Sequence, residues 1–169
     1  MAENIETLLK TSTVYHPTEK TLKEAHIKDY ETAYKESIAD PEKFWEGVAR
    51  ELEWFSPWKQ VLEWKYPWAK WFLDAKCNIS YNCLDRHVKS WRKNKVAVIW
   101  IGERGEERFF TYAELHRQVN KCANALKSIG LKKGDVVTIY LPKIPEQIVA
   151  MLACARIGAI HSCLLYTSD

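Results

Sequence analysis

The side chains able to do chemistry are plentiful in this sequence, but none stands in a recognised catalytic spacing. The 5 histidines are scattered, and no phosphate loop, dinucleotide fingerprint, nucleophile elbow or H-E-x-x-H pattern occurs. His87 and His116 fall on the polar sides of two predicted helices, so we expect both to be solvated. Gly102 and Gly105 flank two charged residues, which is more typical of a hairpin turn than of a nucleotide loop. The sequence therefore predicts no catalytic, cofactor-binding or metal-ligating residue in this chain.

The cysteines indicate a reducing compartment. There are 5 of them, an odd number, and none forms a C-x-x-C pair. The N-terminal residues do not form a secretory signal, so we expect a cytoplasmic protein whose cysteines act as small apolar residues. The longest uncharged runs, Gln147–Ala155 and Ile157–Ser168, are well short of the ~20 apolar residues that a membrane span needs. We therefore expect a soluble chain.

Two clusters have the composition of binding surfaces. One is basic and surrounds Trp91: Arg86, His87, Lys89, Arg92, Lys93 and Lys95. Acidic residues are frequent nearby and the formal charge is only +3, so we interpret this cluster as a solvated helix face and predict no nucleic-acid partner. The other places 5 of the 8 tryptophans within Trp54–Trp71. A sugar- or peptide-binding surface is one reading, but tryptophans mixed with Pro and Lys more often anchor an irregular segment to a neighbouring domain.

The first half of the chain is predicted to be mainly helical. Residues 1–24 read as a mobile leader, and Tyr30, Tyr34 and Ile38 recur on one helix face. The next helix begins at Asp40, which can cap the free N–H groups, and Pro41 suits the first helical position. The negative charge of Glu42 favours the positive end of the helix dipole. The expected buried stripe of this second helix contains Phe44, Trp45, Val48 and Leu52.

A change of pattern follows the second helix. Residues 54–73 contain two prolines and are predicted to be an aromatic, non-repetitive wrap rather than one helix. Asn78 or Ser80 can cap a third helix. Its expected apolar stripe is Tyr81, Leu84, Val88 and Trp91.

Alternating strands and helices are predicted from residue 96 onward. Val96–Ile101 reads as a strand buried on both faces, and Arg108–Phe110 returns as its hairpin partner. Thr111 and Glu114 form a capping box. The helix it starts buries Leu115, Val119, Cys122 and Leu126 and ends at Gly130. A strand at 136–141, a helix from Pro145 to a stop at Gly158, and a strand from 159 complete the order.

This order predicts an α/β fold with a largely parallel sheet, because strand–helix–strand units make right-handed crossovers. We expect an N-terminal helical module, then a β-hairpin and a βαβαβ portion of a larger domain. Only two crossover helices are present, and such a sheet needs helices on both faces. We therefore expect the domain to be incomplete, and the isolated chain to fold poorly.

Several stretches together resemble the AMP-forming acetyl-CoA synthetases of the adenylate-forming superfamily. The stretch that begins at Tyr30, YETAYKESIADPEKFW, is similar to that family's N-terminal module. The stretch that begins at Asn78, NISYNCLDRH, is similar to the helix that follows this module in the family. FTYAEL from Phe110 resembles the first core motif of the superfamily, and residues 134–162 resemble the crossover after it. The resemblance implies a module over residues 25–92 and the start of the AMP-dependent synthetase/ligase domain over 93–162.

For the parent enzyme, the resemblance implies acetate–CoA ligase activity. Acetate and ATP with Mg²⁺ would give acetyl-AMP and diphosphate, and coenzyme A would then take the acyl group. The family's phosphate loop, nucleotide contacts, acyl pocket and catalytic lysine all lie beyond the matched residues. We therefore expect this chain to be inactive and to bind no cofactor. A propionyl-CoA or other short-chain acyl-CoA synthetase is the alternative, and a small interaction module that uses the tryptophan-rich segment is the alternative of another class.

The last seven residues depart from the family's pattern. Residues 163–169, CLLYTSD, resemble the translation of a transposon-end adapter used in DNA library preparation. We interpret them as a non-native tail, and we do not read Tyr166-Thr167-Ser168 as the start of a phosphate loop.

Overall fold

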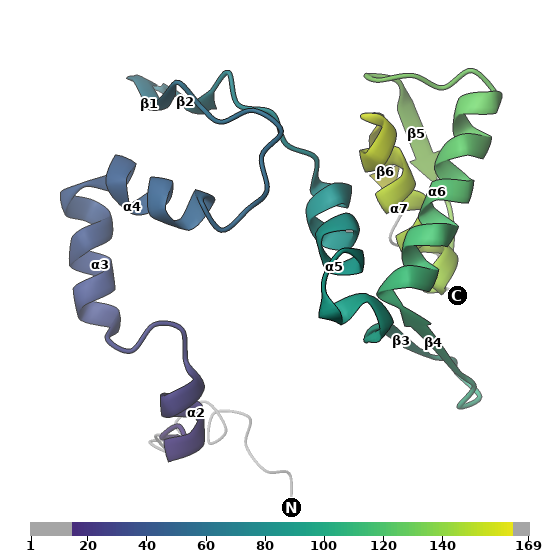
Figure 1. The fold of residues 1–169 in the computed structure, drawn as a ribbon, viewed down its shortest axis with the longest axis horizontal. Helices are drawn as coiled ribbons and strands as arrows, with labels where there is room; N and C mark the ends of the chain where they lie inside the picture. The colour runs from purple at the N-terminus through teal and green to yellow at the C-terminus, as the bar shows by residue number, and fades with distance from the viewer. Residues whose placement is uncertain (1–14, 164–169) are drawn as a thin grey trace, which may run out of the picture. The chain divides into compact units, whose positions relative to one another are not determined.

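The computed structural model describes residues 15–163 (Figure 1). The chain divides into two units, residues 1–45 and 46–169, and each is described by itself. The first contains α2 (Glu19–Glu24), α3 (Tyr30–Ala39) and the beginning of α4 (Pro41–Ala49). The predicted leader, residues 1–24, therefore includes one short helix, and its first 14 residues lie outside the described part.

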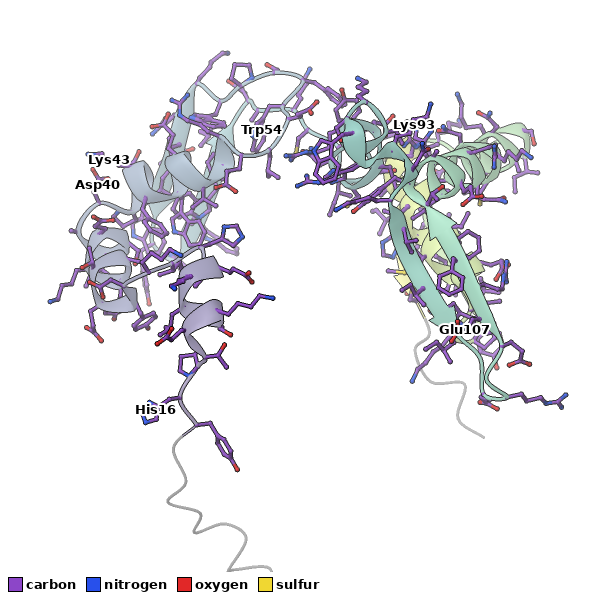
Figure 2. All side chains as sticks on the ribbon, turned by 60° about the horizontal axis from the view of Figure 1, so that its bottom comes forward. His16, Asp40, Lys43, Trp54, Lys93 and Glu107 are labelled. Atoms are coloured by element: carbon purple, nitrogen blue, oxygen red, sulfur yellow. The ribbon has the colours of Figure 1, made fainter. Side chains whose placement is uncertain are left out.

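Both longer helices begin at an aspartate cap, and of the two caps the one at Asp40 was predicted. Asp29 accepts from the backbone N–H groups of Glu31 and Thr32 at the start of α3. The Lys43 N–H donates to Asp40 Oδ1 over 3.0 Å, with Pro41 as the first residue of α4. Figure 2 labels Asp40 and Lys43 at this end of α4. The local part of the prediction is confirmed.

The predicted burial of α4 is wrong for most of its stripe, and the apolar face of α3 is exposed as well. Tyr30 and Tyr34 of α3 stack with ring centroids 6.0 Å apart, and both are exposed. In the expected stripe of α4, Phe44 is half-buried, whereas Trp45, Val48 and Leu52 are exposed. Helical spacing gathers apolar side chains on one face, but the described residues supply no second layer to cover that face.

After the end of α4, the second unit contains a β-hairpin where an irregular wrap was predicted. Strands β1 (Gln60–Lys65) and β2 (Trp68–Leu73) pair antiparallel, with Leu62 opposite Trp71. Pro67 follows a cis peptide bond in the turn, where a proline removes no ladder hydrogen bond. The prediction of a wrap is therefore wrong for residues 60–73.

The predicted third helix is broken into short pieces. A π-helix, η1 (Tyr81–Asp85), runs into α5 (Arg86–Val88), and a 3₁₀-helix, η2 (Trp91–Asn94), follows. Leu84 is buried as predicted, but Trp91 is 72% exposed. The reason is Ser90, whose extended backbone ends the helix and whose Oγ accepts from the Arg92 N–H to begin a new turn.

The predicted second hairpin is confirmed. Strand β3 (Val96–Ile101) pairs antiparallel with β4 (Glu107–Thr111), and Gly105 has a φ of +85° in the turn between them. Figure 2 labels Glu107 at the turn end of β4. Burial of β3 on both faces is wrong, because the two-stranded hairpin packs only one face, through Ala97 and Val98, against the core.

The rest of the unit follows the predicted order of helices and strands. Helix α6 (Tyr112–Ser128) precedes β5 (Val136–Ile139), and α7 (Pro145–Ile157) leads to β6 (Ile160–Cys163). Strands β5 and β6 run parallel, and α7 packs on α6 and on both strands (Figure 1). The buried core is shared between these elements and η1: Leu84, Leu115, Val119, Ala123, Ile139, Ala153, Cys154 and Ala159.

The sequence signals at the ends of these helices are confirmed. Thr111 Oγ1 accepts from the Glu114 N–H, and Glu114 Oε2 accepts from the Thr111 N–H over 2.9 Å, which completes the capping box. Gly158 ends α7 with a φ of +76°.

The predicted tail lies almost wholly outside the described part. Its first residue, Cys163, lies in β6 and pairs with Ile139 of β5, and residues 164–169 are not described. The non-native origin of the tail stays a prediction.

Candidate functional site

The described part of the chain has one cluster of polar side chains at the junction of three elements. Asp85 at the end of η1 faces His116 on α6 and Arg156 on α7. Arg156 Nη2 donates to Asp85 Oδ2 over 2.5 Å and Nη1 to Oδ1 over 3.3 Å. His116 Nε2 lies 3.1 Å from Asp85 Oδ1, and Asn120 Nδ2 lies 3.1 Å from the same histidine nitrogen. The predicted solvated position of His116 is therefore wrong.

The carboxylate of Asp85 is held in its charged form. Its side chain is only 16% exposed, and this burial alone would raise the pKa of Asp85. The hydrogen bonds and the charge of Arg156, with a further contribution from His116, lower that pKa below its ordinary value. A carboxylate already bonded to two partners is a poor general base, so this cluster is suited to fixing helices rather than to proton transfer.

The segment NISYNCLDRH makes further long-range ties through its asparagines. Asn78 Nδ2 donates to the carbonyl of Ala155 over 2.8 Å, at the carboxyl end of α7. Asn82 accepts from the Glu53 N–H over 2.9 Å and donates to the Glu53 carbonyl over 3.0 Å. These contacts hold the chain before β1 on one side and α7 on the other, which gives a physical reason for this run of polar residues.

The basic cluster around Trp91 is largely occupied by contacts within the chain. Arg86 Nη1 donates to the Glu51 carbonyl over 3.0 Å, and Lys89 Nζ donates to the Tyr81 hydroxyl over 2.6 Å. Arg92 and Lys95 both lie over the Trp91 ring.

His87, the histidine of that cluster, is not solvated as predicted. Its ring packs on Tyr112, with centroids 4.8 Å apart. Burial lowers the pKa of His87, and the charges of Arg86 and Arg92 lower it further. The prediction failed because Tyr112, which covers this side of the helix, comes from α6.

The carboxyl edge of β5 and β6 is where parallel α/β sheets usually bind ligands. After β5, Pro142–Ile144 and the β3–β4 hairpin line an open cavity of about 420 Å³. The Trp100 indole donates to the Lys143 carbonyl over 2.7 Å, and Arg108 pairs with Glu146 over 2.9 Å. The Arg108 guanidinium lowers the pKa of Glu146, so both charged groups are paired.

Residues 15–163 contain no group of three or more His, Cys, Asp or Glu residues placed to hold a metal ion. The absence of catalytic and cofactor-binding residues stays a prediction. In the same residue range, no helix combines the length and the apolar character that crossing a membrane would require.

Two family models match the chain side by side. The acetyl-coenzyme A synthetase N-terminus matches residues 30–83, and the AMP-binding enzyme model matches residues 84–168. The two matches meet inside η1, between Cys83 and Leu84. The domain boundaries expected from the sequence, at residues 24, 92 and 162, stay predictions.

Curated relatives are similar over most of this chain. An acetyl-coenzyme A synthetase of Chlorobaculum tepidum is 50% identical over 164 residues, which cover 95% of this chain and 25% of the relative. A 3-hydroxypropionyl-coenzyme A synthetase of Sulfurisphaera tokodaii is 50% identical over 139 residues, covering 81% of this chain and 21% of the relative. The chain thus spans about a quarter of the length of the curated relatives it matches.

A solved structure shares the fold. The acetoacetyl-CoA synthetase from Streptomyces lividans superposes with a TM-score of 0.75 at 30% identity, covering 85% of this chain and 23% of that one. The α/β fold and its incompleteness relative to this larger enzyme agree with the prediction.

Proposed function

This chain belongs to the AMP-binding enzyme family and carries that family's acetyl-coenzyme A synthetase N-terminus, and from this premise we propose that it is part of an acetate–CoA ligase. The observation that carries the proposal is the 50% identity to an acetyl-coenzyme A synthetase over 164 residues, which spans both matched regions. The relative named for 3-hydroxypropionate is equally identical over 139 residues. A short-chain acyl-CoA ligase with another acid as substrate is therefore the second candidate.

The proposed reaction has two steps. A carboxylate is a poor electrophile, so the enzyme first joins it to AMP from ATP, with release of diphosphate. The thiol of coenzyme A then attacks the acyl carbon, and AMP leaves. Catalysis of such a reaction depends on aligning the reactants and on offsetting phosphate charge.

We propose that the groups performing this chemistry lie outside residues 15–163. The described residues do not fit a phosphate-binding site for ATP, because they contain no glycine-rich phosphate loop. We therefore derive no catalytic step from this chain and expect it to be inactive by itself.

In this proposal the described residues have a supporting role. Strand β6 follows α7 directly, so the position of the helix decides where the strand ends. Asn78 holds the carboxyl end of α7, and the Asp85–Arg156 pair fixes the same turn. All 5 cysteines are free, which suits a reducing compartment, and we place the enzyme in the cytoplasm.

A chimera tests this proposal. Residues 1–162 would replace the matching segment of the Chlorobaculum tepidum acetyl-coenzyme A synthetase, and acetate-dependent ATP–diphosphate exchange would be measured. We expect the exchange rate to lie within about tenfold of that of the unmodified relative. The relative supplies the catalytic groups, so the expected defect is a small shift in their positions rather than their loss. A folded chimera without exchange would contradict the proposal.

Two controls sharpen the result. The 169-residue chain alone should show no exchange, and any activity would place catalytic groups inside it. The chimera should also keep the relative's preference between acetate and propionate. A changed preference would mean that residues of this chain shape the acyl pocket.

A further inference from the structure

A basic groove lies at the amino edge of β5 and β6, where the loops after α6 and α7 meet. Its volume is about 610 Å³. The lining contains four cationic side chains and two neutral amides and no acidic side chain: Asn120, Asn124, Lys127, Lys132, Lys133 and Arg156. Asp85 already pairs with Arg156, so the uncompensated charge of the groove comes from its three lysines.

These lysines have no acidic partner in the described part of the chain. No carboxylate between residues 15 and 163 lies within 4.0 Å of the ammonium of Lys127, Lys132 or Lys133. The three lysines therefore give the groove an unpaired positive charge, which an anion from outside the chain would offset.

The lysines are not needed as hydrogen-bond donors to the last carbonyls of the two helices. At the end of α6, the Leu131 N–H donates to the Leu126 carbonyl over 3.2 Å, and the Gly130 N–H donates to the Lys127 carbonyl over 3.0 Å. At the end of α7, the Ala159 N–H donates to the Cys154 carbonyl over 2.9 Å. Backbone donors therefore already satisfy these carbonyls, as in other glycine-terminated helices.

The loop that carries Lys132 and Lys133 is fixed on both sides. Asp135 Oδ2 accepts from the Lys132 N–H over 2.8 Å, and the Gly134 N–H donates to the Gly158 carbonyl over 3.0 Å. The stem of Lys133 lies against Gly158, where an added Cβ would meet its Cγ at 3.0 Å. The backbone of the groove is thus ordered before any ligand arrives, which lowers the entropic cost of binding.

We propose that this groove binds a small phosphate-bearing anion. Three ammonium groups that line a single hollow suit a ligand with several negative charges close together, and phosphate oxygens accept from ammonium donors. Asn120 and Asn124 add neutral donors along the α6 side. The inference rests on this groove alone and is independent of the proposed ligase activity.

The test uses inorganic diphosphate as the probe and calorimetric titration as the readout. It is made on the full 169-residue chain and repeated on the chimera, so that weak folding of the shorter protein does not decide the result. In the chimera the difference between the groove variant and the unsubstituted chimera is read, because the proposed catalytic site, which also binds diphosphate, is common to both. The groove variant is Lys127→Gln with Lys132→Gln. The matched control is Lys93→Gln with Lys121→Gln, which removes the same charge from exposed positions outside the groove.

We expect saturable binding at about 0.15 M salt, weakened about tenfold by the groove variant and less than twofold by the control. AMP and free phosphate would then show whether the groove prefers a nucleotide or an inorganic anion. Equal losses in both variants, no saturable binding, or citrate binding as tightly as diphosphate would overturn the proposal.

Discussion

Arg156 Nη2 lies 2.5 Å from Asp85 Oδ2, although the two residues are 71 positions apart in the chain. The pair joins the end of η1 to the last turn of α7, and with His116 it links three elements that share no local sequence signal. It is only partly exposed, at 21% for Arg156 and 16% for Asp85, so water screens it less than a surface pair.

Asp85→Asn should destabilise the chimera by about 2–4 kcal/mol, because it leaves a largely buried guanidinium without its counter-charge. The free energy of unfolding in urea measures this. Adding Arg156→Gln should cost less than the sum of the two single changes, and additive costs would contradict direct coupling.

The same pair predicts an acid limit. The pKa of Asp85 is lowered in the folded chain, so the contribution of the pair is complete above the ordinary aspartate pKa of about 3.9 and is lost as the pH falls through the lower folded value. The free energy of unfolding should therefore depend less on pH below about pH 4 in Asp85→Asn than in the unsubstituted protein. Urea unfolding at several pH values measures this dependence.

His87 predicts a second pH dependence, in a different range. Burial against Tyr112 lowers its pKa, so protonation favours the unfolded chain. Its contribution to stability should be complete above the ordinary histidine pKa of about 6.5 and should be lost as the pH falls through the lower folded value. Unfolding of the chimera at pH 7.5 and pH 5.5 measures the loss, which His87→Phe should reduce. His26→Gln, at an exposed position, should leave it unchanged, and an equal effect of both variants would refute the assignment.

Two glycines should respond oppositely to the same substitution. Gly158→Ala should destabilise the chimera by about 1–2 kcal/mol, because φ is +76° and the new Cβ would press on Lys133. Gly47→Ala, inside α4 with open space around it, should stabilise by about 0.5–1 kcal/mol. Thermal melting of both variants checks this, and the same sign for both would be inconsistent with the backbone at Gly158.

The exposed face of β3 should make the isolated chain associate. Ile101 is 65% exposed, so Ile101→Lys should raise the monomer fraction in light scattering without lowering stability. Val98 packs against the core from the opposite face, so Val98→Lys should instead destabilise by about 3 kcal/mol. An unchanged monomer fraction for Ile101→Lys would mean that association occurs through another surface.

Local signals in the sequence predicted the local structure well. The Thr111–Glu114 capping box, the Asp40 cap and the Gly158 stop each depend on residues within one helical turn, and all are found in the structure. The hairpin of β1 and β2 was missed because its proline was read as a break in a segment, whereas Pro67 forms the turn between two strands.

Burial and long-range polar contacts were harder to predict. Helical spacing placed Trp91 in an apolar stripe, but Ser90 redirects the chain before that face is complete. His116 was read as solvated because its partner Asp85 comes from an element 31 positions earlier. No pattern within one helix reveals such a partner, since it depends on how α6, η1 and α7 pack.

The bond from Asn78 to the Ala155 carbonyl also has a consequence for synthesis on the ribosome. The two residues are 77 positions apart, so the amide is made well before its acceptor. At roughly 5–20 residues per second, the asparagine is without this partner for roughly 4–15 s. During that interval Asn78 and Asp85 emerge without α7, whose Ala155 carbonyl and Arg156 side chain they bond in the folded chain, and a chaperone that covers apolar surface would act on the nascent chain in this window.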